Sequence, residues 1–236
     1  MAAAGAIGRQ IIDAILSERL APQTRLGEQD LAALFGCSRT VVREAMVDLA
    51  ARGIVTVSPR RGWYLAEVDA GAARELYIAR EVIETGLLRH FARQGERLEP
   101  AALARLEDHL ARQEAAVNSA DPARRAYLLG DFHVRLAEAL GNSVLADYLR
   151  DLTVRTTLFT TRHQTPLDAH RSLQEHIAVI EALARGDAAE AELRMRHHLG
   201  TWEDKVQKAQ VHDPLDGLRR ALVPRRQGYS EGRSPA

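Results

Sequence analysis

Apolar residues at helical spacing open the chain. From residue 7 to residue 20 they recur three and four positions apart, as one face of a helix requires, and Pro22 closes the segment. The stretch EQDLAALFG then predicts a second, shorter helix that stops at Gly36. Its inward side is expected to carry three apolar residues: Leu31, Leu34 and Phe35.

A third predicted helix has a polar start and one apolar face. Ser38 stands where an N-cap residue belongs, ahead of the run RTVVREAMVDLAARG. Apolar residues repeat at three- and four-residue spacing along one side of this run: Val42, Ala45, Met46 and Leu49. Two helices joined by such a short turn form a helix-turn-helix.

Two β-prone runs follow the third helix. IVTVS and WYLAEV flank the turn sequence PRRG, which predicts a β-hairpin with basic residues at its tip. A hairpin placed after a helix-turn-helix is a wing. Residues 1–68 are therefore expected to form a winged helix-turn-helix domain.

Beyond Val68 the pattern changes to long helices. N-cap residues, Pro122 and glycines mark the ends of six predicted helices. These lie near residues 70–94, 99–118, 122–140, 143–162, 168–185 and 188–208. We expect residues 69–210 to form an all-α six-helix bundle. From residue 211 to residue 236 Pro, Gly, Ser and Arg accumulate without periodicity, which predicts a disordered tail. The fold class is thus mainly α.

Composition says more about the cellular compartment expected for this protein than about its function. Cys37 is the single cysteine, so no disulfide can form within the chain. A signal peptide and an apolar run long enough to span a bilayer are both lacking, so a cytoplasmic protein with no membrane partner is expected. The net charge is zero, yet residues 37–62 hold five arginines against two acids. A phosphate backbone senses such local charge.

The third helix carries the residue types that read DNA. A recognition helix presents short polar and basic side chains on its first turns, and Ser38, Arg39, Thr40 and Arg43 occupy that position. At the wing tip Arg61 would contact the DNA backbone or minor groove, and Gly62 would allow a close approach. A solvated helix face is the alternative interpretation of the arginines, and the basic hairpin beside the helix favours DNA.

Three histidines lie on the apolar stripes of three different bundle helices: His133, His176 and His198. They should point inward, as metal ligands, as donors to a bound ligand, or as separately satisfied core residues. His197 would point about 100° away from His198 and is expected on the surface. Arg80 and Arg155 could clamp an organic acid, or form ion pairs such as Arg80 with Glu84.

The first domain resembles that of GntR-family bacterial regulators. The segment from ILSERL to RRGWYL carries the resemblance, with SRTVVREAM and PRRG as its specific parts. The resemblance implies that Ser38, Arg39, Thr40, Arg43 and the wing residues contact DNA, and that Gln29 lies where the family often contacts phosphate. One departure is Pro22 followed by Gln23, where the family usually has Pro-Gly.

The second domain resembles the FCD effector domain of the FadR subfamily, and its six helices look like the VanR-type branch. The matching segments are ARELYIAREVIETGLL, FHVRLAEALGNSVL and EHIAVIEALARGDAAEAELRMRHHL. Many such domains bind a divalent metal through an Asp and three His, and the three histidines fall at those positions. Leu129 stands where the Asp is expected, and Asp131 lies on the wrong side of the helix. All-imidazole ligation would favour Zn²⁺ or Ni²⁺ as an anchor for a carboxylate effector.

The leading hypothesis is a homodimeric regulator, not an enzyme. It would bind a palindromic double-stranded DNA operator and respond to a small organic acid in the bundle. One rival is a metalloenzyme that uses the three histidines. The lack of a general base beside them argues against it. The other is a DNA-binding protein without effector, whose bundle serves dimerisation only.

Overall fold

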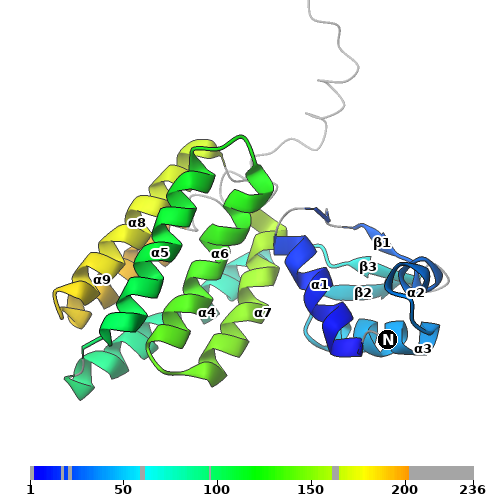
Figure 1. Ribbon diagram of the computed structural model, residues 1–236, viewed down its shortest axis with the longest axis horizontal. Coiled ribbons are helices and arrows are strands. Elements are labelled where there is room, and N and C mark those ends of the chain that lie inside the picture. The colour runs from blue at the N-terminus through cyan, green and yellow to red at the C-terminus, as the bar shows by residue number, and fades with distance from the viewer. Residues whose placement is uncertain are drawn as a thin grey trace, which may run out of the picture.

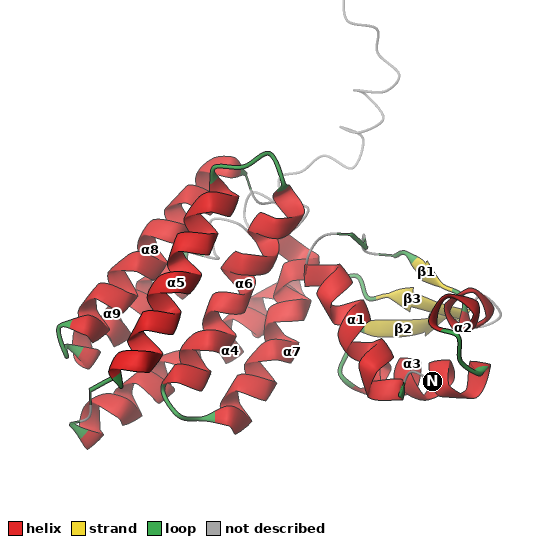
Figure 2. Ribbon diagram, viewed as in Figure 1, coloured by secondary structure: helices red, strands yellow, loops and turns green. Residues whose placement is uncertain are grey.

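Two lobes lie side by side in the computed structural model, which describes residues 3–16, 19–20, 23–58, 62–95, 97–160 and 165–201 (Figure 1). The smaller lobe holds the N-terminal helices and all three strands, and the larger one consists of helices alone (Figure 2). The mainly α fold class is confirmed.

The smaller lobe is a winged helix-turn-helix. Its elements are α1 (Ala4–Leu16), β1 (Arg25–Leu26), α2 (Glu28–Phe35), α3 (Arg39–Ala51), β2 (Val55–Ser58) and β3 (Gly62–Leu65). The strands form an antiparallel sheet in the order β1-β3-β2, with Ser58 opposite Gly62 as the last pair before the turn of the hairpin. The hairpin was predicted, whereas β1 was not, because two residues are too few to show a period.

Helix α3 is bounded as the sequence predicts. The Ser38 hydroxyl accepts a hydrogen bond from the backbone N–H of Val41, and α2 ends at Gly36 in the left-handed conformation. All four apolar residues expected on its inner side are buried. The expectation for α2 was wrong at Leu34, which is 75% exposed. Leu31 and Phe35, one turn apart, pack on the core, and Leu34 lies off that stripe.

Gln23 adopts a positive φ of 63° in the turn before β1. This is the position where the resembled family usually has glycine, which enters the left-handed region without a steric penalty. The Gln23 amide donates a hydrogen bond to Glu67, which follows β3 in the chain. The departure therefore affects the turn and leaves α3 untouched.

The larger lobe contains the six expected helices. They are α4 (Ala70–Gln94), α5 (Pro100–Val117), α6 (Pro122–Ala139), α7 (Ser143–Thr160), α8 (Pro166–Ala184) and α9 (Ala188–Gly200). Helix α4 packs against α7 and α9, and α5 packs against α6 and α8. The predicted continuation of α9 to residue 208 and the tail from residue 211 to residue 236 lie outside the described residues.

Helix α7 joins the lobes. Val154 and Leu158 on α7 are buried in the same apolar cluster as the α1 and α3 side chains. At the end of α3, Arg52 donates from Nε to Asp151 of α7 at 3.0 Å. The winged helix is thus packed directly onto the bundle. None of the helices in the described part of the chain is long and apolar enough to cross a membrane.

Candidate functional site

The polar start of α3 faces solvent. Arg39, Thr40 and Arg43 are exposed on the side of α3 opposite its buried stripe, and Ser38 caps the helix beside them. Gln29, on the first turn of α2, is exposed as well. At the wing Gly62 has a φ of 94°, a conformation that favours glycine. The other predicted wing contact, Arg61, lies outside the described residues.

Glu28 holds the two arginines of α3. Its carboxylate accepts two hydrogen bonds from Arg43, at 2.9 Å from Nε and 2.8 Å from Nη2, and a longer one from Arg39 at 3.3 Å. Trp63 of β3 donates its indole N–H to the same group at 3.1 Å. Hydrogen bonds from Arg43 and then Trp63 lower the pKa of Glu28 to about 2. Glu28 therefore links α2, the recognition helix and the wing.

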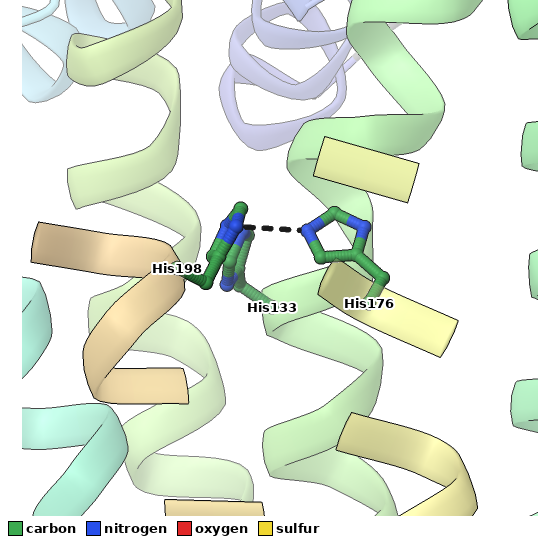
Figure 3. A group of neighbouring side chains, drawn as sticks. All are labelled: His133, His176 and His198. Carbon is green, nitrogen blue, oxygen red and sulfur yellow. Dashed lines mark hydrogen bonds between the residues drawn. The ribbon is translucent and has the colours of Figure 1, made fainter. Parts of the chain in front are cut away.

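In the larger lobe the three histidines meet. His133 of α6, His176 of α8 and His198 of α9 are all buried, and one ring nitrogen from each lies within 4.8 Å of the others. Figure 3 shows the three rings converging, with the Nε2 atoms of His176 and His198 only 3.2 Å apart. His197 is exposed, as expected. The structure thus brings together the whole predicted trio.

Each histidine has a partner at the ring nitrogen that faces away from the cluster. The Nδ1 atoms of His133 and His198 lie 2.6 Å from Glu84 and 2.7 Å from Glu175. The Nδ1 of His176 lies 2.8 Å from the side-chain oxygen of Gln113. A carboxylate or amide oxygen can only accept, so each Nδ1 carries a proton and each Nε2 of a neutral ring presents a lone pair.

Both buried rings whose titration is resolved are neutral near pH 7. Burial, followed by the charge of Arg80, lowers the pKa of His133 to about 3. Burial and the neighbouring His198 hold the pKa of His176 well below its usual value. The Nε2 atoms of His176 and His198 lie 3.2 Å apart, so a proton or a metal ion between these two nitrogens would join the rings. The neutral His133 and His176 rings each have a lone pair that can bind a metal ion.

The donor set fits a divalent metal. Nitrogen ligands at about 2.0–2.1 Å from one tetrahedral zinc ion lie roughly 3.3 Å apart, close to the His176–His198 separation. Histidine ligands typically donate their other N–H to a carboxylate or carbonyl oxygen, as all three do here. The residues present are therefore suited to hold Zn²⁺ or Ni²⁺ through three imidazoles.

A small cavity of about 50 Å³ borders the trio, and we call it the histidine cavity. Arg80 and Thr153 line it together with the three histidines. Arg80 is buried, bonded to Glu84 through Nε at 3.0 Å and to Thr156 through Nη1 at 3.2 Å. Its buried Nη2 and the Thr153 hydroxyl have no hydrogen-bond partner within the described part of the chain. Buried donors left in this state are suited to an anionic ligand.

The sequence also singled out Arg155, Leu129 and Asp131, and none of these three offers a ligand atom to the cavity. Arg155 packs instead against the winged helix, where its Nε lies 3.2 Å from the position a Cβ on Gly53 would take. Leu129 is buried in the cavity wall and offers no ligand atom. Asp131 faces α5 and pairs with His109 and Arg135, so it is not a ligand.

The sequence reasoning missed the partners of the histidines. Glu84 was considered only as an ion-pair partner of Arg80, and Glu175 and Gln113 not at all. A signal for Gln113 was present, because it and His109 interrupt the buried stripe of α5 at helical spacing. Polar residues on such a stripe need partners inside the protein.

Comparisons with known proteins agree with this architecture. Residues 3–65 match the gntR family of bacterial regulatory proteins, and residues 75–201 match the FCD domain. A helix-turn-helix transcriptional regulator from an unstable DNA locus of Streptomyces ambofaciens is 29% identical, over 89% of this chain and 88% of its own. The Uxu operon transcriptional regulator of Escherichia coli is 28% identical, over 82% of each chain.

Solved structures share the fold. Escherichia coli McbR/YncC superposes with a TM-score of 0.77 at 19% identity, covering 89% of this chain and 99% of its own. A GntR regulator from Rhodococcus sp. RHA1 superposes with a TM-score of 0.72 at 24% identity, covering the same shares. The matched family model and the two curated relatives are those of transcription regulators. The chain accordingly belongs to the GntR family of bacterial transcription regulators, with an FCD domain as its second domain.

Proposed function

We propose that this regulator binds a palindromic operator as a homodimer, and that a small organic acid in the histidine cavity changes its affinity for that operator. One observation carries the proposal: a buried arginine with an unpartnered donor lines a cavity formed by three converging histidines. A carboxylate satisfies both features, since it pairs with arginine and coordinates a metal.

DNA contacts are assigned to the exposed start of α3 and to the wing. In this proposal Arg43 reads a guanine, Arg39 and Thr40 contact bases or phosphates, and Ser38 and Gln29 contact phosphate. Gly62 and Arg61 complete the surface at the wing. The geometry of Arg43 supports its role, because Glu28 occupies only Nε and one side of Nη2. The end of the guanidinium remains exposed and available to O6 and N7 of guanine.

A second copy of the chain supplies the second half-site. One winged helix contacts one half of a palindrome, so two copies related by a two-fold axis are needed. The neighbouring helices α4 and α7 carry large apolar side chains that are mostly exposed, with Val82 at 68% and Tyr148 at 63%. Exposed apolar residues gathered on adjacent helices are typical of an interface, and we assign this face to the second copy.

Metal and acid share the histidine cavity. His133, His176 and His198 would hold Zn²⁺ or Ni²⁺, which supplies a Lewis-acid anchor for one carboxylate when bound. Arg80 would pair with the acid through Nη2, and the Thr153 hydroxyl would add a hydrogen bond. The cavity volume of about 50 Å³ restricts the acid to a few non-hydrogen atoms in this conformation.

Helix α7 offers a route from the cavity to the DNA-binding lobe. Its Thr153 and Thr156 line the cavity, while Asp151 and Val154 contact the winged helix. A ligand that moves α7 therefore moves the base of the recognition helix. Such a shift would change the spacing of the two recognition helices in a dimer.

Operator binding by an Arg43 variant tests the DNA assignment. Arg43→Ala is expected to weaken binding to a selected operator by about 1–3 kcal/mol with the fold intact, because a bidentate base contact is lost. Fluorescence anisotropy with labelled operator measures this. Arg9→Ala, which removes an exposed arginine from α1, is the matched control. Equal affinities of wild type and Arg43→Ala would refute the contact.

A further inference from the structure

A chain of hydrogen bonds runs through the bundle from the surface of α6 to the histidine cavity. Asp131 Oδ2 lies 3.2 Å from His109 Nε2, and His109 Nδ1 lies 2.9 Å from the Gln113 amide nitrogen. The Gln113 oxygen then meets His176 Nδ1 at 2.8 Å. His109 and Gln113 are almost completely buried, at 1% and 0% exposure. Buried polar groups of this kind are costly unless every member is satisfied.

The order of donors along this chain follows from its outer end. Arg135 donates to Asp131 at 2.9 Å, so Asp131 is present as a carboxylate and can only accept. His109 must therefore carry its proton on Nε2 and offer a lone pair at Nδ1. Gln113 can satisfy that lone pair only with its amide N–H, which turns its oxygen towards His176. That oxygen accepts a hydrogen bond from the N–H at His176 Nδ1, so the lone pair of the neutral ring is on Nε2.

We propose that Asp131, His109 and Gln113 are positioning residues that keep the proton of His176 on Nδ1, so that Nε2 faces the centre of the trio as a metal ligand. This inference rests on the proposed metal site and gives a role to a carboxylate that is not itself a ligand. Glu84 and Glu175 orient the other two histidines directly. His176 differs because its direct partner is an amide, which has two possible orientations and requires the chain to select one.

Zinc affinity of substituted proteins tests the proposal. Gln113→Leu preserves side-chain size and removes the acceptor, so zinc affinity at pH 7 is expected to fall roughly 10- to 100-fold in competition with a chromophoric chelator. Gln113→Glu keeps an acceptor at His176 and should bind zinc much more tightly than Gln113→Leu. His109→Gln can accept from Gln113 and donate to Asp131, and should also retain zinc binding, whereas His109→Leu should not.

Two controls separate this role from a purely structural one. Thr85→Val removes a buried hydroxyl elsewhere in the bundle and should leave zinc affinity unchanged. In the metal-free wild type, a long-range ¹H–¹⁵N NMR spectrum should show His176 protonated at Nδ1, a readout that needs no variant to fold. Protonation at Nε2, or Gln113→Leu binding zinc as tightly as wild type, would overturn the inference. Wild type failing to bind zinc while His176 is protonated at Nδ1 would instead refute the metal site and uphold the tautomer.

Discussion

At the scale of single residues, Glu28 fixes the orientation of Arg43, for which we propose a base contact. Its carboxylate is largely buried, with 15% of the side chain exposed, whereas 60% of the Arg43 side chain is accessible. If Arg43 contacts DNA as proposed, the Glu28 carboxylate beside it would repel the phosphate backbone and weaken non-specific binding. The benefit of the Glu28–Arg43 pair is orientation, because an arginine held along one edge of its guanidinium directs its other N–H groups outward.

Replacing Glu28 should therefore separate affinity from specificity. Glu28→Gln is expected to raise affinity for random-sequence DNA severalfold at low salt, since one negative charge is lost. It should also lower the ratio of operator to random-sequence affinity, because Arg43 loses its paired acceptor. Asp30→Asn removes a charge from the same helix and serves as control. If the two variants keep the same ratio as wild type, Glu28 does not orient Arg43.

The buried histidines predict how stability depends on pH. Below pH 6.5 the unfolded chain binds a proton at His133 that the folded protein, with a pKa of about 3, does not bind. The free energy of unfolding of the metal-free protein should therefore fall as the pH drops from 6.5 towards 3. The expected slope is up to about 1.4 kcal/mol per pH unit for each such histidine.

Urea titrations across this pH range measure the slope. His133→Gln should remove one histidine's share of it, while the exposed His197→Gln should leave it unchanged. A slope that is the same in His133→Gln and wild type would contradict the assignment.

For each contact in the candidate sites, sequence patterns identified one of the two residues but not its partner. Helical periodicity placed Arg43 on the outer face of α3 and three histidines on inner stripes, and both placements are confirmed. Glu28 and Gln113 escaped because their bonds join positions 15 and 63 residues apart. Neither periodicity nor capping carries information about such distant pairs.

At the scale of elements, the helices were predictable and the shortest strand was not. Glycines, prolines and capping residues marked the bundle helices to within a few residues, apart from the predicted end of α9, which lies outside the described residues. The two-residue strand β1 depends on its pairing with β3, and the outward position of Leu34 depends on how α2 packs, neither of which a local pattern encodes.

The pair of helices α4 and α7 is also where we expect the dimer interface. Tyr148→Arg places a charge in the exposed apolar face and should convert dimers to monomers in sedimentation velocity experiments, because burying an unpaired charge is costly. Leu193→Arg, at an exposed position on α9, should sediment as wild type does. A dimer that persists in Tyr148→Arg would place the interface elsewhere.

At the scale of the whole molecule, the contact between the lobes means that a movement of α7 in the bundle reaches the winged helix. Arg52 and Asp151 are 99 residues apart, and the packing of Val154 and Leu158 into the winged helix was not foreseeable from either segment alone. The same helix α7 borders the histidine cavity, so one helix contacts both the cavity and the winged helix.

The effect of small acids on operator binding tests this account most directly. Operator affinity of the zinc-loaded protein should be measured by anisotropy while acetate, lactate and other short carboxylic acids are titrated at constant ionic strength. At least one acid is predicted to change the affinity 5- to 150-fold, the usual range of allosteric coupling. Arg80→Met should bind the operator without that response. Operator affinity that is unchanged by every acid and by the removal of zinc would contradict the proposed function.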